Sequence, residues 1–100
     1  MNARDRKARE RLTIGLLIDN IWDPIAWEVW AGVDDVATEQ GANLLCFVGG
    51  ALRPSATALV QGNVLYDLVS AENVDGLAIW GGGLGQFVSP EQVESFCERY

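Results

Sequence analysis

Hydrophobic positions along the chain form three short apolar runs, each followed by a segment with helical signals. The first run, RLTIGLLI (11–18), is apolar at both alternating positions, as is typical of a strand covered on both faces. Two similar runs are ANLLCFV (42–48) and DGLAIW (75–80). The βαβαβα order predicts a parallel sheet with right-handed crossovers and the first run in the middle.

Three helices are predicted from their start and stop signals. The first begins after Asp23, an N-cap acceptor that precedes a proline, and runs to about Gln40, just before a glycine. The second spans about 57–70, and the third follows Ser89, which forms a capping box with Gln92. The helical positions expected to be buried are Ala26, Val29, Trp30, Val33, Val36 and Ala37, then Leu65, Leu68 and Val69, and finally Val93, Phe96, Cys97 and Tyr100.

Charge separates a basic leader from an acidic body. Residues 1–11 hold five of the seven basic side chains, whereas 12–100 hold two basic and twelve acidic ones. An acidic body repels a phosphate backbone, so we expect no nucleic-acid contact by this domain. The leader is interpreted as a solvated linker, with contact to nucleic acid as the alternative.

Composition is that of one globular domain, with 49% hydrophobic residues in a chain of 100. No apolar run approaches the roughly 20 residues of a membrane helix. The first apolar run is short, and no small-residue cleavage site follows it. These features favour a cytoplasmic chain without membrane contact.

Catalytic and metal-binding signatures are missing from the sequence. There is no histidine, and Cys46 and Cys97 stand alone in apolar settings that predict buried, reduced thiols. The acidic residues Asp34, Asp35 and Glu39 are typical of a solvated helix face. We therefore expect no catalytic residues, no metal, no cofactor and no enzyme activity.

A glycine-rich segment, GGGLGQFV (81–88), follows the third apolar run. A phosphate-binding P-loop would close with lysine and serine or threonine, but Gln86 and Phe87 stand there. A dinucleotide fingerprint would follow the first strand, where this chain has DNIWDP. We predict a loop that lines a ligand cleft, with a plain flexible connection as the alternative.

The predicted ligand site lies at the carboxyl ends of the first and third strands. Loops that leave adjacent parallel strands meet at one edge of the sheet, where open α/β folds bind ligands. The candidate binding residues there are Asp19, Asn20, Trp22, Asp23, Gly81, Gly82, Gly83 and Phe87.

Longer stretches of the chain resemble a known superfamily. TIGLLIDNIWDPIAWEVWAGVDDVATEQGANLLCFV is similar to the opening of lac-repressor and ribose-binding proteins: an apolar strand, a polar loop and a proline-initiated helix, with GANLL entering the next strand. NLLCFVGGALR, NVLYDLVSAENVDGLAIWGGGLG and SPEQVESFCERY resemble sensor modules of that superfamily. Such modules occur in bacterial signalling proteins with diguanylate cyclase or histidine kinase outputs, and in some repressors. The resemblance covers 12–100.

The resemblance implies a periplasmic-binding-protein-like type 1 fold, a three-layer α/β/α arrangement with strand order 2-1-3. The chain would supply the first part of the N-terminal lobe of a two-lobed sensor, with further strands after Tyr100, so the fold is expected to be incomplete. Ligand contacts in sugar-binding relatives fall on positions matching Asp23, Ile25 and Ala26. Asp23 keeps a polar contact, but Ile25 and Ala26 offer no aromatic stacking surface.

The three tryptophans of IWDPIAWEVW are expected to have separate roles. Trp30 lies on the stripe that faces the sheet and is interpreted as core. Trp22 either stacks on a ligand or packs its own loop. Trp27 lies away from the sheet and is predicted to contact a second subunit or lobe.

The leading functional prediction is a regulatory module that binds a small polar molecule, sugar-like or another metabolite, in an interlobe cleft. Closure of the two lobes would bias an output domain or a homodimer. The alternative is the effector-binding domain of a lac-repressor-type transcriptional regulator, without its DNA-binding part in this chain. A third interpretation is a protein-interaction module that has lost ligand binding.

Overall fold

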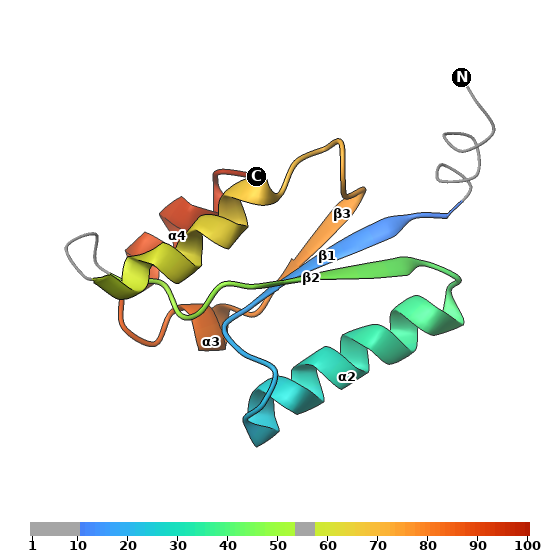
Figure 1. The fold of residues 1–100 in the computed structure, drawn as a ribbon, viewed down its shortest axis with the longest axis horizontal. Coiled ribbons are helices and arrows are strands. Elements are labelled where there is room, and N and C mark those ends of the chain that lie inside the picture. Colours follow the sequence, from blue (N-terminus) through green and yellow to red (C-terminus); the bar gives the residue numbers. More distant parts are fainter. Residues whose placement is uncertain (1–10, 54–57) are drawn as a thin grey trace.

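The fold is a three-stranded parallel β-sheet flanked by helices (Figure 1). The computed structural model describes residues 11–53 and 58–100. Strand β1 (Thr13–Ile18) lies between β2 (Asn43–Val48) and β3 (Gly76–Ile79), in the order β2-β1-β3. This arrangement confirms the predicted α/β class, the parallel sheet and the central position of the first strand.

Strand β1 is paired along both edges and covered on both faces. It pairs with β2 from Thr13 to Ile18 and with β3 from Ile14 to Leu17. Leu16, Leu17 and Ile18 are at most 1% exposed. Burial of such a side chain contributes roughly 1.5–3 kcal/mol. The doubly apolar run in the sequence therefore corresponds to a strand buried on both sides.

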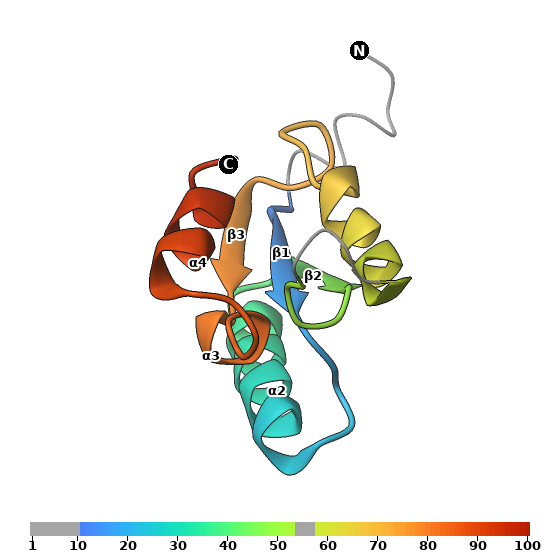
Figure 2. The same cartoon turned by 90° about the vertical axis from the view of Figure 1, so that its left-hand side faces the viewer.

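The helices form a layer on each face of the sheet (Figure 2). Helix α2 (Pro24–Glu39) covers one face, where Leu16, Ile18 and Ala26 form a buried cluster. The 3₁₀ helix η1 (Ala58–Leu68, yellow) and helix α4 (Pro90–Cys97) cover the other face. The core on that side consists of Leu17, Phe47, Leu52, Tyr66, Val74, Leu84 and Phe96.

Helix α2 forms as its end signals predict. The Asp23 side chain accepts a hydrogen bond from the Ala26 N–H at 2.8 Å, and the helix ends before Gly41, whose φ is +69°. Only glycine adopts such a φ readily, so it stops the helix without strain. Most of the predicted stripe packs against the sheet, but Val36 is 58% exposed.

The second predicted helix differs in type and in its buried residues. It is a 3₁₀ helix, whose tighter winding turns Leu65 and Leu68 toward solvent, at 41% and 61% exposure. Tyr66 is fully buried instead, with its hydroxyl 2.6 Å from Gly50 O and 3.1 Å from Ile18 O. Burial raises the pKa of Tyr66, so the hydroxyl keeps the proton that it donates. The predicted burial of Leu65 and Leu68 is wrong.

The glycine-rich segment also departs from its predicted loop. Residues Gly81–Leu84 form a short helical turn, α3, beneath the carboxyl end of the sheet (Figure 1). Helix α4 then starts with the predicted capping box, in which Gln92 N–H donates to Ser89 Oγ and Ser89 N–H donates to Gln92 Oε1. Tyr100 is 42% exposed but donates a hydrogen bond to Tyr66 O at 2.9 Å.

Two further predictions are met only in part. Trp30 is half-buried and packs against the cluster of Leu16, Ile18 and Ala26. It therefore belongs to the core only in part. Cys46 and Cys97 are free thiols but half-buried rather than buried. The basic leader, apart from Arg11, and residues 54–57, which include the predicted start of the second helix, lie outside the described residues.

Within the described part of the chain, no helix has both the length and the apolar character needed to cross a bilayer.

Candidate functional site

A cavity of about 510 Å³ opens at the carboxyl ends of β1 and β3. The loop before α2 supplies one wall, and the α3 turn supplies the other. The lining residues are Asp19, Asp23, Pro24, Ile25, Ala26, Trp80, Gly82, Gly83 and Gln86. The volume falls within the roughly 300–1,000 Å³ range of small-molecule sites. The predicted meeting of the two loops at this edge of the sheet is thus observed.

Asp19 is the most unusual group in this cavity. Its side chain is 6% exposed, and its Oδ2 accepts hydrogen bonds from Asn20 Nδ2 at 3.0 Å and from Gln86 Nε2 at 2.9 Å. Its Oδ1 is buried and has no hydrogen-bond partner among the residues that the structure describes. A buried polar atom without a partner is costly, and an unpaired carboxylate oxygen especially so. Asp19 therefore retains acceptor capacity that its own protein does not use.

The glycines of α3 make room for Asp19 and Trp80. A Cβ on Gly83 would lie 2.6 Å from Asp19 Cγ and 2.5 Å from Trp80 Cδ1, and closer still to Asp19 Oδ1. A Cβ on Gly82 would lie 2.9 Å from Trp80 Cη2. These distances are below normal contact, so neither position accepts a side chain without displacement. The glycine cluster thus serves close packing around a carboxylate rather than the cradling of a phosphate.

Asn20 organises the loop that carries both carboxylates. Its amide donates to Asp19 Oδ2 at 3.0 Å and to Asp23 Oδ2 at 2.7 Å. Its Oδ1 accepts from the backbone N–H groups of Trp22 and Asp23, each at 3.0 Å. One amide side chain therefore fixes the loop and holds the two aspartates beside each other.

Asp23 is shared between helix capping and the cavity. The Ala26 backbone N–H and the Asn20 amide, both donating to its side chain, hold the pKa of Asp23 below its usual value. A hydrogen bond to a charged carboxylate favours the ionised form. Asp23 is therefore an anion at neutral pH.

Five of the predicted binding residues line this cavity: Asp19, Asp23, Ile25, Gly82 and Gly83. Asn20 does not line it but supports it through the hydrogen bonds described above. Four further lining residues were not named as binding residues from the sequence: Pro24, Ala26, Trp80 and Gln86. Ala26 nevertheless matches a ligand-contact position of the sugar-binding relatives. Trp80 had a usable signal, because it ends the third apolar run immediately before the glycines.

The other three predicted residues lie outside the lining. Trp22 is 78% exposed in the loop before α2, and Phe87 is half-exposed with the Arg53 guanidinium 3.8 Å from its ring centroid. Gly81 belongs to a separate, smaller hollow formed with α4. The α3 turn explains these positions, because it directs Gly81 and Phe87 away from the side where Gly83 meets Asp19.

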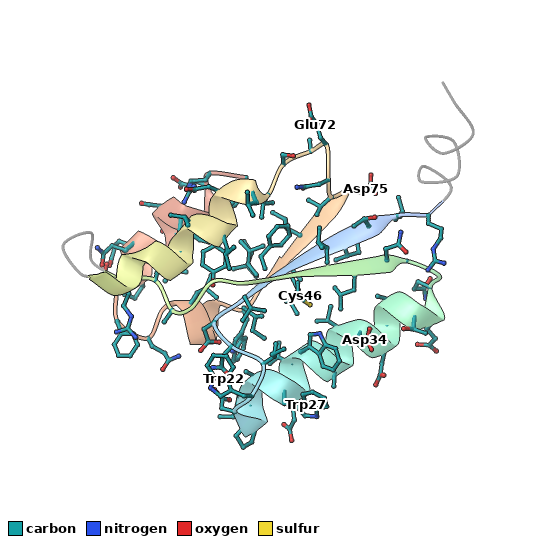
Figure 3. All side chains as sticks on the ribbon, viewed as in Figure 1. Trp22, Trp27, Asp34, Cys46, Glu72 and Asp75 are labelled. Atoms are coloured by element: carbon teal, nitrogen blue, oxygen red, sulfur yellow. The ribbon has the colours of Figure 1, made fainter. Side chains whose placement is uncertain are left out.

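Two of the tryptophans form a pair. The ring centroids of Trp27 and Trp30 are 4.8 Å apart, with the planes tilted by 38°. Trp27 is 52% exposed on α2, and Trp22 lies near the start of that helix (Figure 3). Trp30 thus packs against Trp27, and the predicted contact of Trp27 with a second subunit or lobe stays a prediction.

The cavity is lined by few kinds of polar group. The sequence has no histidine, and residues 11–53 and 58–100 contain no cluster of three or more metal-ligating side chains. Only carboxylates, one amide, an indole and aliphatic groups face the space. Such a set suits recognition of a small molecule by charge and hydrogen bonds.

Comparisons of the chain with protein-family models, with curated proteins and with solved structures found no match.

Proposed function

We propose that this chain is a ligand-sensing module, the first part of the N-terminal lobe of a two-lobed sensor of the periplasmic-binding-protein-like type 1 kind. The observation that carries the proposal is the buried carboxylate of Asp19, which lines a cavity at the sheet's carboxyl edge and has one oxygen without a partner among the described residues. Buried polar atoms without a hydrogen-bond partner are rare in folded proteins, and a ligand donor would supply the partner that Oδ1 lacks.

The position of the cavity supports this proposal. In open α/β sheets, ligands bind outside the carboxyl ends of the strands, where the strand order reverses direction. Strand β1 stands at that point, because the chain passes from β1 to β2 on one side and then crosses to β3 on the other. Asp19 is the first residue after β1, so the sheet itself places the carboxylate there.

A second lobe would close over the exposed rim of this cavity. Ile25 lines the cavity and is 64% exposed, and Trp22 in the same loop is 78% exposed. Exposed apolar groups beside a ligand site are typical of surfaces that a partner covers. In the proposed sensor, the ligand bridges both lobes and closure is transmitted to an output domain.

A set of small polar metabolites, each added to ¹⁵N-labelled protein, tests the proposal directly. A binding compound should shift the amide signals of Gly82 and Gly83 and the indole signal of Trp80. The indole signal of Trp27, which does not line the cavity, serves as the internal control. If no compound produces shifts at the cavity, the proposal of a ligand-sensing module is wrong.

A further inference from the structure

We infer that the cavity takes a small organic cation that carries N–H groups, a primary amine or a guanidine, on a short apolar body. The inference deepens the proposed function and rests on it. The required complement follows from two features of the described lining: its charge, and the acceptor that it leaves unused.

The charge of the lining is negative. Asp19 and Asp23 both face the cavity, and no basic side chain lines it. Arg53 instead stacks on Phe87, and Arg99 pairs with Asp67. Residues 11–53 and 58–100 together hold twelve acidic and three basic side chains, so the wider field also attracts cations.

The lining offers a ligand a hydrogen-bond acceptor that is not already in use. Asp19 Oδ2 already receives two donors, whereas Asp19 Oδ1 receives none. A ligand N–H would satisfy Oδ1, and a charged donor would also offset the cost of burying the carboxylate. Because Oδ1 lies against Gly83, a ligand reaches it by displacing the four-residue α3 turn.

The remaining lining is apolar and sets the body of the ligand. Ile25, Ala26 and Trp80 offer aliphatic and aromatic surface next to the two carboxylates. An amine on a short hydrocarbon chain fits both parts, because its cationic end meets Asp19 while its chain packs against the indole.

Four probes separate charge, hydrogen bonding and shape: n-butylamine, butyltrimethylammonium, 1-butanol and D-ribose. Each is titrated into the labelled chain at constant pH and ionic strength, with the Trp80 indole signal as the reporter. We expect n-butylamine to bind with a dissociation constant at least about tenfold below those of the other three, the scale of one charge-assisted hydrogen bond. Equal binding of 1-butanol or butyltrimethylammonium overturns the inference.

Three variants locate the effect. Asp19→Asn keeps the shape and should remove most of the preference for n-butylamine, and Asp23→Asn, which still caps α2, should reduce it. Glu72→Gln makes the same charge change on an exposed turn at the other end of the sheet (Figure 3) and should leave binding unchanged. An equal loss in Glu72→Gln would show that only net charge matters and would overturn the site.

The experiments distinguish failure of the organic-cation inference from failure of the proposed ligand-sensing function. Binding of D-ribose in place of n-butylamine, with shifts at Gly82 and Gly83, overturns the cation while leaving a ligand-sensing module in place. Absence of shifts with all four probes also overturns the cation, and the metabolite set described above then decides the proposed function independently.

Discussion

Two aspartates at opposite ends of the sheet show what distinguishes a candidate site from an ordinary polar end. Asp75 precedes β3, is exposed, and accepts a hydrogen bond from Thr13 N–H at 2.8 Å (Figure 3). Asp19 follows β1, is buried, and has an oxygen without a donor. The same residue type thus serves strand pairing at one end and remains unsatisfied at the other.

The surroundings of the two carboxylates explain the difference. Around Asp75, water completes whatever hydrogen bonds the protein leaves open. Around Asp19, the side chains of Asn20 and Gln86 and the Gly83 backbone leave the residue only 6% exposed. Burial by tightly fitted neighbours, rather than the presence of a carboxylate, therefore distinguishes the candidate site from the amino end of the sheet.

The largest expected effect comes from the fit of Gly83 against Asp19. Gly83→Ala should lower the free energy of unfolding by about 1–3 kcal/mol, because its Cβ would overlap Asp19 and Trp80. The matched control is Gly32→Ala within α2, where nothing lies within 4 Å of the new Cβ. That change should raise stability by up to roughly 1 kcal/mol. Urea unfolding of both variants measures the difference, and equal effects would contradict the close packing at Gly83.

Tyr66 secures the carboxyl end from the other face of the sheet. Tyr66→Phe should cost about 1–3 kcal/mol, because Gly50 O loses its buried donor and Ile18 O loses a close hydroxyl. Thermal or urea unfolding measures this loss. Tyr100→Phe is the control, since the Tyr100 side chain is 42% exposed, and it should cost less. A smaller loss for Tyr66→Phe than for Tyr100→Phe would refute the buried role of Tyr66.

Asp75 should contribute little to the free energy of unfolding, because its side chain is exposed. Asp75→Asn retains an acceptor for Thr13 N–H and loses only the charge, so we expect a change of about 0.5 kcal/mol or less. Urea unfolding at low and high salt checks this value. A loss comparable to that of Gly83→Ala would remove the contrast between the two ends of the sheet.

The smallest expected effect is a pH dependence from Asp23. Its pKa lies below the ordinary value of 3.8, so the folded state favours the ionised form. This stabilisation is complete above the unfolded pKa and is lost as the pH falls through the lower, folded pKa. Acid titration should therefore show a smaller loss of stability for Asp23→Asn than for the wild type below about pH 4. Identical acid profiles would contradict the capping role of the charged form.

The sheet and α2 were predictable because their signals are local. A doubly apolar run identifies the buried strand β1, and the sequence from Asp23 to Gly41 contains both ends of α2. The 3₁₀ helix was not predictable, because Tyr66 is buried by a tertiary hydrogen bond to Gly50 O, 16 residues earlier. Helical periodicity alone favoured Leu65 and Leu68.

The candidate site was predictable in place but not in detail. Parallel strand order brings the residues after β1 and β3 together, so Asp19 and Gly83 could be expected to lie close. The helical turn of α3, which turns Phe87 outward and Gln86 toward Asp19, depends on packing that four glycines do not specify. The neighbouring sequence likewise does not indicate that the Trp22 side chain points into solvent.

The most direct test of the central claim, that Asp19 is kept for binding rather than for stability, needs no ligand. The free energy of unfolding is measured in urea for the wild type and for Asp19→Asn. The asparagine removes a buried charge, and its remaining oxygen still accepts from Asn20 and Gln86, so we predict stability equal to or above the wild type. A loss of more than about 1 kcal/mol would contradict the claim and assign Asp19 to the fold.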